Sequence, residues 1–160
     1  MSGTETEFEE IYKKYYPSVY RICGSMFSKP DMRDDVVQEV FIKVWQNLKF
    51  FKNQSSLFTW IYRITINTSL NYKSRVVANK TTGYESVVHL PVENNNLEDE
   101  RKRQLQNCIG KLRDDERIIV SLYLEGFSYN EISEIVGITV TNIGVKLNRI
   151  KPKLKICMED

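Results

Sequence analysis

The sequence has few cysteines, a single histidine and no long hydrophobic run. Its 160 residues include 3 Cys and 1 His, and Cys23, Cys108 and Cys157 lie far apart with no Cys-x-x-Cys pair. This spacing suggests neither a disulfide framework nor a zinc site. The longest hydrophobic stretches, such as 118–124, are far shorter than the roughly 20 residues of a bilayer span, and the acidic N-terminus is unlike a signal peptide. We therefore expect a cytoplasmic protein with no membrane insertion, no metal and no other cofactor.

Motifs that carry catalytic chemistry are also missing. The sequence has no histidine and carboxylate cluster, no glycine-rich phosphate loop and no activated nucleophile. Asp34 and Asp35 have no partners at metal-binding spacing. An enzyme, for instance a nuclease or a small helical hydrolase, is therefore disfavoured, and we predict no catalytic residue.

The charged residues are segregated along the chain, although the net charge is only +2. Residues 1–39 carry eight acids against five bases, whereas residues 40–84 carry seven bases and no acid. Residues 85–100 then carry five acids and no base, and residues 135–158 carry five bases and no acid. Two basic blocks separated by an acidic block predict two contacts with a polyanion such as nucleic acid.

Apolar residues recur at helical spacing through most of the chain, and strand signals are sparse. The expected helices cover residues 5–27, 28–48, 57–77, 97–110 and 114–125, followed by a terminal pair. Ser28 is predicted to cap the second of these helices, with Pro30 in its first turn. Residues 79–98 include Gly83, Pro91 and three consecutive Asn and have no such period, so we interpret even the extended stretch 84–90 as linker. We expect an all-α chain of two small helical domains, 1–78 and 99–160, joined by a flexible acidic linker over 79–98.

The last thirty or so residues have the spacing of a helix-turn-helix. Ser128 and Glu131 form a capping box that begins one helix. Gly137 supplies the conformation that ends it, and Thr139 caps the next helix two residues later. This terminal helix is predicted to be the one that enters a DNA groove.

The terminal helix has two faces. The apolar face is Ile143, Leu147, Ile150 and Leu154. The predicted DNA-binding residues lie opposite and are Thr141, Asn142, Val145, Lys146, Arg149 and Lys153. Pro152 should kink or end the helix near Lys151. A helical hairpin with a merely solvated basic face is the alternative interpretation.

The helix over 28–48 combines a core stripe with an unusual opposite face. That face mixes acids with an apolar residue and a tryptophan: Asp35, Gln38, Glu39, Ile42, Trp45 and Gln46. Exposed apolar anchors among acids indicate a binding site for a protein partner. An ordinary solvated face with a tryptophan at its edge remains the alternative.

The helix over 57–77 carries a polar set that is typical of a nucleic-acid surface. The predicted contacts are Ser56, Trp60, Arg63, Asn67, Asn71, Lys73 and Arg75. Cations contact phosphates, amides bond to bases, and Trp60 with the nearby Phe50 and Phe51 can stack on unpaired bases. Aromatic residues at helical spacing are also common in protein cores, which is the competing interpretation.

In combination, these motifs resemble the extracytoplasmic function sigma factors, the smallest members of the bacterial sigma-70 group. Residues 34–45 resemble region 2.2, the family's helix for the clamp coiled coil of core RNA polymerase. Residues 58–64 with Asn67 are similar to the segment that opens and reads the promoter −10 element. Residues 128–155 are similar to region 4.2, which reads the −35 element. The resemblance covers nearly the whole chain.

The resemblance implies a sigma factor that binds core RNA polymerase, directs it to promoter DNA and helps melt the −10 element. The acidic linker would imitate nucleic acid in a basic channel of the polymerase. An anti-sigma factor is a further partner that the resemblance leaves open. Asn71, Arg113, Gly144 and Pro152 depart from the family's usual residues, which leaves the promoter sequence open. A stand-alone helix-turn-helix regulator of duplex DNA is the alternative function.

Overall fold

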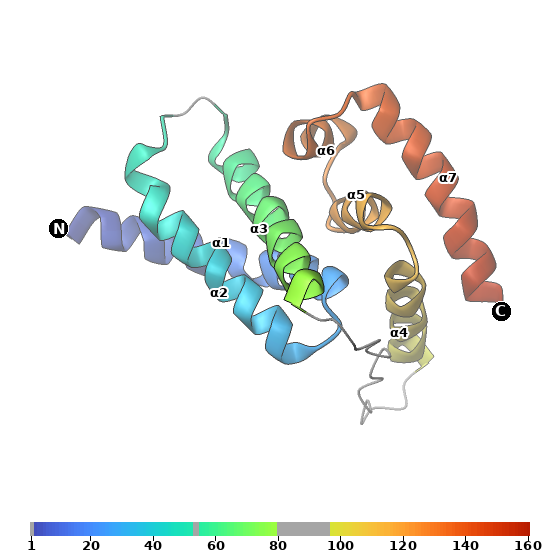
Figure 1. The fold of residues 1–160 in the computed structure, drawn as a ribbon. Helices are drawn as coiled ribbons and strands as arrows, with labels where there is room; N and C mark the ends of the chain where they lie inside the picture. The colour runs from blue at the N-terminus through green and yellow to red at the C-terminus, as the bar shows by residue number, and fades with distance from the viewer. Residues whose placement is uncertain (1, 53–54, 80–96) are drawn as a thin grey trace. The chain divides into compact units, whose positions relative to one another are not determined.

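The computed structural model describes residues 2–52, 55–79 and 97–160, and every regular element within them is helical. The helices form two compact units, Met1–Tyr84 (unit 1) and Glu85–Asp160 (unit 2) (Figure 1). Unit 1 contains α1 (Ser2–Met26), α2 (Pro30–Asn47), a 3-10 helix (Leu48–Phe50) and α3 (Leu57–Asn79). Unit 2 contains α4 (Leu97–Gly110), α5 (Asp114–Leu124), α6 (Tyr129–Val136) and α7 (Val140–Glu159). The predicted all-α class is confirmed; most of the predicted linker, residues 80–96, lies outside the described residues.

Unit 1 packs three helices around one core. Every residue of the core stripe predicted for the helix over 28–48 is buried: Val37, Val40, Phe41 and Val44 of α2, and Leu48 of the 3-10 helix. α3 adds buried hydroxyl groups to this core, and each forms a hydrogen bond within the helix. Thr65 donates to the Ile61 carbonyl at 2.9 Å, and Ser69 donates to the Thr65 carbonyl at 2.8 Å. These bonds let polar side chains enter the core without leaving a donor unsatisfied.

The starts of α2 and α3 differ in how they are capped. Ser56 caps α3, since its Oγ accepts a hydrogen bond from the Thr59 amide at 3.1 Å. The cap predicted at Ser28 is wrong: Lys29 occupies that position in α2 and makes no side-chain cap bond. Pro30 occupies the first turn of α2, where its fixed φ suits a helix and its missing N–H costs nothing. The fixed φ of Pro30 therefore starts α2, and no side-chain hydroxyl caps this helix.

Unit 2 has the predicted helix-turn-helix. At the start of α6 the Ser128 amide donates to Glu131 Oε1 at 2.8 Å, and Ser128 Oγ accepts from the Glu131 amide at 3.1 Å. Gly137, at φ 79°, ends α6 in the left-handed conformation that glycine adopts without strain. Thr139 Oγ1 then accepts from the Asn142 amide at 3.1 Å and starts α7.

Pro152 was predicted to kink or end α7 near Lys151, and the predicted end is wrong: the helix continues through Pro152 to Glu159. A proline removes only one backbone hydrogen bond, and packing on both sides can hold a helix together across that gap. The cysteine spacing suggested no disulfide, and this expectation is also wrong. Cys108 of α4 and Cys157 of α7 are bonded, with Cα atoms 5.9 Å apart. Their 49-residue separation in sequence closes because α4 packs against α7.

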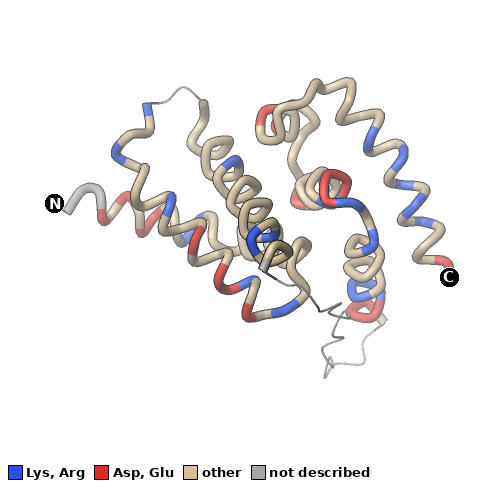
Figure 2. The backbone as a smooth tube through the Cα atoms, in the orientation of Figure 1, with Lys and Arg blue, Asp and Glu red and all other residues tan. Residues whose placement is uncertain are grey.

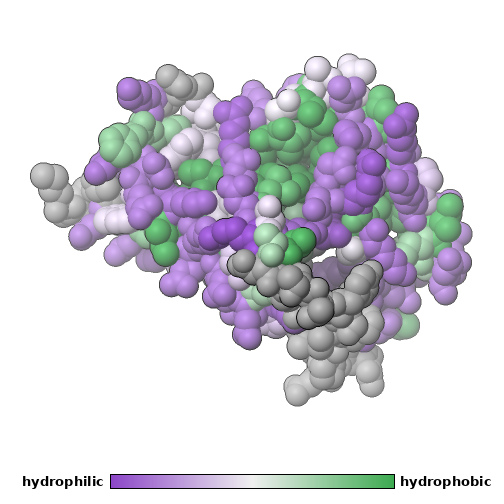
Figure 3. Space-filling view, in the orientation of Figure 1, coloured by the Kyte–Doolittle hydropathy of each residue, from purple (hydrophilic) through white to green (hydrophobic). Residues whose placement is uncertain are grey.

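Hydrophilic residues cover most of the visible surface of each unit (Figure 3). Within the described ranges, no helix has both the length and the hydropathy of a bilayer span. Those ranges also hold no cluster of three or more His, Cys, Asp or Glu side chains that could bind a metal.

Candidate protein and nucleic-acid interfaces

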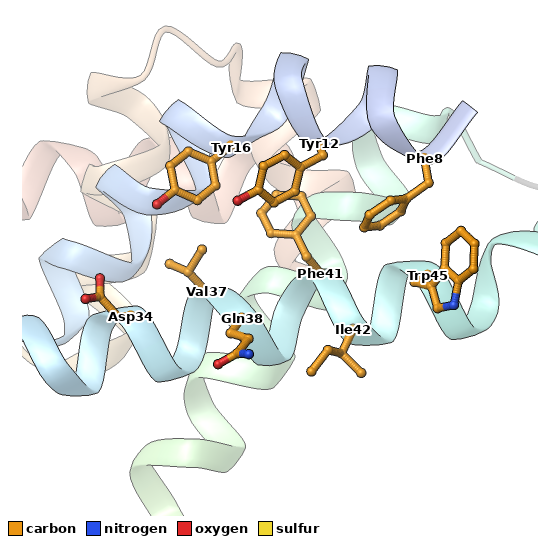
Figure 4. A pocket seen from close by; sticks show the side chains of 9 residues that line it. All are labelled: Phe8, Tyr12, Tyr16, Asp34, Val37, Gln38, Phe41, Ile42 and Trp45. Carbon is orange, nitrogen blue, oxygen red and sulfur yellow. The ribbon is translucent and has the colours of Figure 1, made fainter. Parts of the chain in front are cut away.

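An open groove of about 590 Å³ lies between α1 and α2, and we call it the aromatic groove (Figure 4). Its lining residues are Phe8, Tyr12, Tyr16, Asp34, Val37, Gln38, Phe41, Ile42 and Trp45. The rings of α1 point toward α2: Phe8 lies 5.1 Å from Trp45 and Tyr12 lies 4.8 Å from Phe41, centroid to centroid. Ile42 and Trp45 remain 47% and 43% exposed, which is high for large apolar side chains.

The aromatic groove sharpens the predicted partner face of α2. Gln38, Ile42 and Trp45 line it as one set. Sequence reasoning missed the contribution of α1, because it assigned no partner surface to the helix expected over residues 5–27. The spacing of four residues between Phe8 and Tyr12, continued by Tyr16, was the signal for one aromatic row on the helix.

The other part of the predicted partner face turns toward α3. Tyr72 Oη donates to Asp35 Oδ2 at 3.3 Å. Arg75 Nη2 donates to both carboxylate oxygens of Glu39, at 2.8 and 2.9 Å. Partial burial and the nearby Asp35 carboxylate raise the pKa of Tyr72. The structure thus joins Glu39, a predicted protein-binding acid, to Arg75, a predicted DNA contact, and joins Asp35 to Tyr72. Gln46 is exposed.

A second pocket of about 280 Å³ lies between α2 and α3, and we call it the α3 pocket. Its lining residues are Lys43, Asn47, Phe50, Trp60, Ile64, Asn67 and Thr68. The Trp60 ring lies 5.0 Å from that of Phe51, and Phe50 is 63% exposed. The pocket therefore combines exposed aromatic surface with two amides and one ammonium group. Lys43 and Asn47 were missed as site residues because they lie on α2, remote in sequence from the predicted set.

The other predicted residues of α3 are spread over its surface. Arg63 and Asn71 are exposed, and Lys73 is half-buried. Ser56 has a structural role as the α3 cap, where it also donates to Thr59 Oγ1 at 2.9 Å. The structure brings only Trp60 and Asn67 of the predicted set into the α3 pocket.

The predicted DNA-binding face of α7 divides into exposed and ion-paired residues. Thr141, Asn142, Val145 and Arg149 are exposed. Lys146 Nζ donates to Asp115 Oδ2 at 3.0 Å. Cationic positions follow one another along α7, and acidic ones return only at its C-terminal end (Figure 2).

The second ion pair involves a buried carboxylate. Lys153 Nζ donates to Glu116 Oε2 at 2.8 Å, and the Glu116 side chain is only 7% exposed. The hydrogen bond from Lys153 lowers the pKa of Glu116, and the one from Lys146 lowers that of Asp115. Two lysines of α7 are thus anchored to α5.

The chain matches two known protein families over most of its length. Residues 11–77 match Sigma-70 region 2 and residues 102–154 match Sigma-70, region 4. The ECF RNA polymerase sigma-E factor of Haemophilus influenzae is 29% identical, over 96% of this chain and 88% of its own. The protein of the same name from Escherichia coli K12 is 30% identical, over 93% of this chain and 85% of its own.

Two solved structures have a similar fold. The sigma factor RpoE, in complex with the anti-sigma factor NepR from Bartonella quintana, matches with a TM-score of 0.78 and 23% identity, over 96% of this chain and 97% of its own. CnrH, in complex with the cytosolic domain of CnrY, matches with a TM-score of 0.75 and 19% identity, over 99% of this chain and 91% of its own.

These matches define a protein of the sigma-70 type with regions 2 and 4 in separate units. The chain belongs to the extracytoplasmic function sigma factors. It therefore directs transcription initiation by RNA polymerase and is not an enzyme. The family membership disfavours the stand-alone regulator that was considered from the sequence.

Proposed function

We propose that this sigma factor uses three surfaces on two domains: the aromatic groove for polymerase, the α3 pocket for the −10 element and the exposed face of α7 for the −35 element. Residues 1–78 form the first domain, 99–160 the second, and 79–98 the connector. The observation that supports this division most is that apolar anchors, a base-sized pocket and a basic helix occupy separate surfaces.

The aromatic groove suits the clamp coiled coil of core RNA polymerase. A groove with exposed apolar anchors binds an amphipathic helix by burying that helix's apolar face. Ile42 and Trp45 supply these anchors, and Asp34 places a carboxylate in the same lining. Truncation of such anchors commonly costs about 2 kcal/mol or more of binding free energy.

The α3 pocket suits an unpaired base of the melted −10 element. Trp60 and Phe50 offer aromatic faces on which a base stacks, a contact worth about 1–3 kcal/mol. The amides of Asn47 and Asn67 can bond to the base edge, and Lys43 can contact a phosphate. Capture of an extruded base in this way offsets the free energy of unpairing it.

The exposed residues of α7 suit the major groove of the −35 element. Thr141, Asn142, Val145 and Arg149 come before Pro152 on the free face of the helix. An arginine can bond to guanine with two donors, and an asparagine can bond to adenine with a donor and an acceptor. Lys146 and Lys153 contribute mainly by holding α7 against α5, since both ammonium groups are ion-paired.

Reconstitution with purified core polymerase tests the proposal. Core polymerase is mixed with promoter fragments, with and without this protein, and permanganate reactivity of unpaired thymines locates the melted region. Protein-dependent complexes with melting at one −10 position, and footprint protection upstream at −35, are expected. Complexes that form without melting or without upstream protection would contradict the division of surfaces.

Two further points rest on the same proposal. Because RNA polymerase acts in the bacterial cytoplasm, we place the protein there. An anti-sigma factor is the second protein partner that we propose, and the support is that both similarly folded proteins were solved as complexes, one of them with a named anti-sigma factor.

A further inference from the structure

The disulfide between α4 and α7 joins two segments of unit 2 that bury few side chains. The buried residues of α7 are Ile143, Leu147 and Ile150, and none follows Pro152. After Pro152, Leu154 is only half-buried and Ile156 is 62% exposed. After Pro152, α7 has no fully buried side chain, and its contacts with the rest of unit 2 include the Lys153–Glu116 ion pair and the disulfide.

α4 depends on the same cross-link. Its buried residues are Cys108 and Ile109, both at its C-terminal end, whereas Leu97 at the other end is 85% exposed. Pro152 also leaves one backbone carbonyl of α7 without its helical hydrogen bond. The cross-link thus joins α4, which buries few side chains, to the part of α7 after Pro152, which buries none fully.

We propose that Cys108 and Cys157 form a reversible redox site that controls how firmly the end of α7 is held. Disulfides of cytoplasmic proteins are usually transient or redox-sensing rather than permanent. Low-molecular-weight thiols and their disulfides are the chemical partners in this exchange. The oxidised form locks the end of α7 onto α4, and the reduced form releases it.

The exchange is a two-electron reaction in two steps. A small-molecule thiolate attacks Cys157 Sγ, forms a mixed disulfide with it and breaks the bond to Cys108, which leaves as a thiolate and takes up a proton. A second thiolate attacks the small molecule's sulfur in the mixed disulfide and releases Cys157 as a thiolate, which is also protonated. Two small thiols become one disulfide as the protein disulfide becomes two thiols, and oxidation is the reverse.

Accessibility favours attack at Cys157. This residue is half-buried in the last turns of α7, whereas Cys108 is only 6% exposed. Cys23, in unit 1, provides an internal contrast because its side chain is fully buried and burial raises its pKa to about 11. A buried thiol that stays protonated reacts slowly, so Cys23 should not respond.

The consequence for DNA rests on the proposed function of α7. Lys155 is exposed in the stretch after Pro152 that the cross-link holds in helical form. Release of this stretch disperses a cation that can contact a phosphate, which weakens −35 binding and lowers its dependence on salt. Oxidation should therefore strengthen the upstream contact.

The test uses the full chain in buffers with different ratios of reduced to oxidised glutathione. Alkylation followed by mass spectrometry counts the thiols, and hydrogen exchange follows the amides of 153–159. We expect Cys108 and Cys157 to change together, Cys23 to stay unchanged, and exchange over 153–159 to rise at least about tenfold on reduction. A pair that stays bonded in fully reducing glutathione, or equal exchange in both states, would overturn the proposal.

Three variants separate the redox site from general effects. Cys157→Ser and Cys108→Ala should each exchange like the reduced protein in every buffer, and the matched control Cys23→Ala should keep the full response. A response that persists without Cys157 or without Cys108 would overturn the proposal. Duplex binding to a −35 fragment is measured in parallel, and we expect at least about threefold tighter binding by the oxidised protein.

The two proposals fail in different ways. Redox-dependent exchange at the end of α7, with no promoter binding in either state even with core polymerase, would contradict the proposed function alone. Promoter binding that is equal in both states would contradict the redox control alone.

Discussion

Unit 1 and unit 2 each place basic residues on a helix of the proposed DNA surface, but they hold these cations differently. In unit 1, Arg75 of α3 is paired with Glu39 on the edge of the predicted polymerase face of α2. In unit 2, Lys146 and Lys153 of α7 are paired with Asp115 and Glu116 of α5. Docking of polymerase on α2, as we propose it, would therefore change the surroundings of an arginine on α3, whereas the ion pairs of unit 2 involve no residue of the proposed polymerase site.

The two units also differ in how their exposed apolar side chains are arranged. Unit 1 gathers Ile42 and Trp45 in the aromatic groove and has a second pocket on α3. Unit 2 fully buries Leu122, Ile132, Ile143, Leu147 and Ile150, and its exposed apolar residues, such as Leu97, Leu124 and Ile156, are spread over three helices. A domain that meets both protein and melted DNA needs several recesses, and a domain that reads duplex DNA needs one regular helix.

The strongest test of this difference is the double variant Ile42→Ala with Trp45→Ala. Loss of both anchors should weaken core polymerase binding by about 2–4 kcal/mol, roughly 30-fold or more. Affinity is measured by competition with a labelled sigma factor. Leu70→Ala removes an exposed apolar side chain of α3 that does not line the groove, so it is the matched control and should bind normally.

Glu39 needs a different control. Glu39→Arg should also weaken polymerase binding, but it places a cation against Arg75, whose Nη2 lies 2.8 Å from the Glu39 carboxylate. Arg75→Ala breaks the same pair without changing the acid. Equal losses in both variants would show that Glu39 acts through α3 and not through direct contact with polymerase.

The next effect concerns the α3 pocket. Trp60→Ala should reduce −10 melting by about 1–3 kcal/mol in transition free energy, because a stacking surface is lost. Permanganate reactivity of the holoenzyme complex measures this loss of melting.

Arg149→Ala is the reciprocal variant in unit 2. It should weaken −35 protection, with melting intact once the complex has formed. Equal effects of the two variants on both elements would erase the distinction between the units.

A smaller effect is the acid sensitivity of unit 2. The lowered pKa values of Asp115 and Glu116 mean that their contribution to stability is present above the unfolded-state values of 3.8 and 4.5 and is lost as the pH falls through the folded-state values. We expect a loss of about 1 kcal/mol from pH 6 to pH 3. Hydrogen exchange over α6, corrected for the intrinsic rate, reports unit 2, whereas both Trp residues report unit 1 by fluorescence.

Variants of Glu116 and Lys153 test whether this ion pair causes the loss of stability at low pH. Glu116→Gln and Lys153→Met should each flatten the pH profile, and the double variant should add little to either. Additive effects would show that the two side chains act independently despite their 2.8 Å contact.

The smallest effect is expected at Gly144 of α7. A Cβ atom at this position would lie 3.7 Å from the Tyr129 ring, an ordinary van der Waals contact. Gly144→Ala should therefore stabilise unit 2 by about 0.5–1 kcal/mol through helix propensity alone. Denaturant unfolding followed by hydrogen exchange over α7 measures the gain. A destabilised variant would indicate that α7 needs this glycine for its curvature.

Local signals in the sequence predicted a large part of the fold. The capping box at Ser128 and the cap at Thr139 involve groups within four residues, so they formed as predicted. The burial of Val40 and Val44 followed from helical period in the same way. Ser28 failed as a cap because Pro30 set the start of α2 by its own φ.

Sites that combine distant segments were predicted only in part. The sequence predicted that Trp45 and Trp60 lie on surfaces that bind partners. It did not predict that the ring of Phe8 lies beside Trp45, or that Lys43 lines the same pocket as Trp60. Periodicity tells which residues share one helix face, but not which neighbouring helix that face meets.

The sequence by itself determined the helices, their order, the helix-turn-helix and the charge blocks, because each depends on residues close together in the chain. Only the tertiary structure decided that Cys108 meets Cys157, that Arg75 meets Glu39, and that Lys153 meets Glu116. Each of these pairs joins residues more than thirty positions apart, with sequence separations of 49, 36 and 37. Such pairs form only when packing of the apolar faces has brought their helices together.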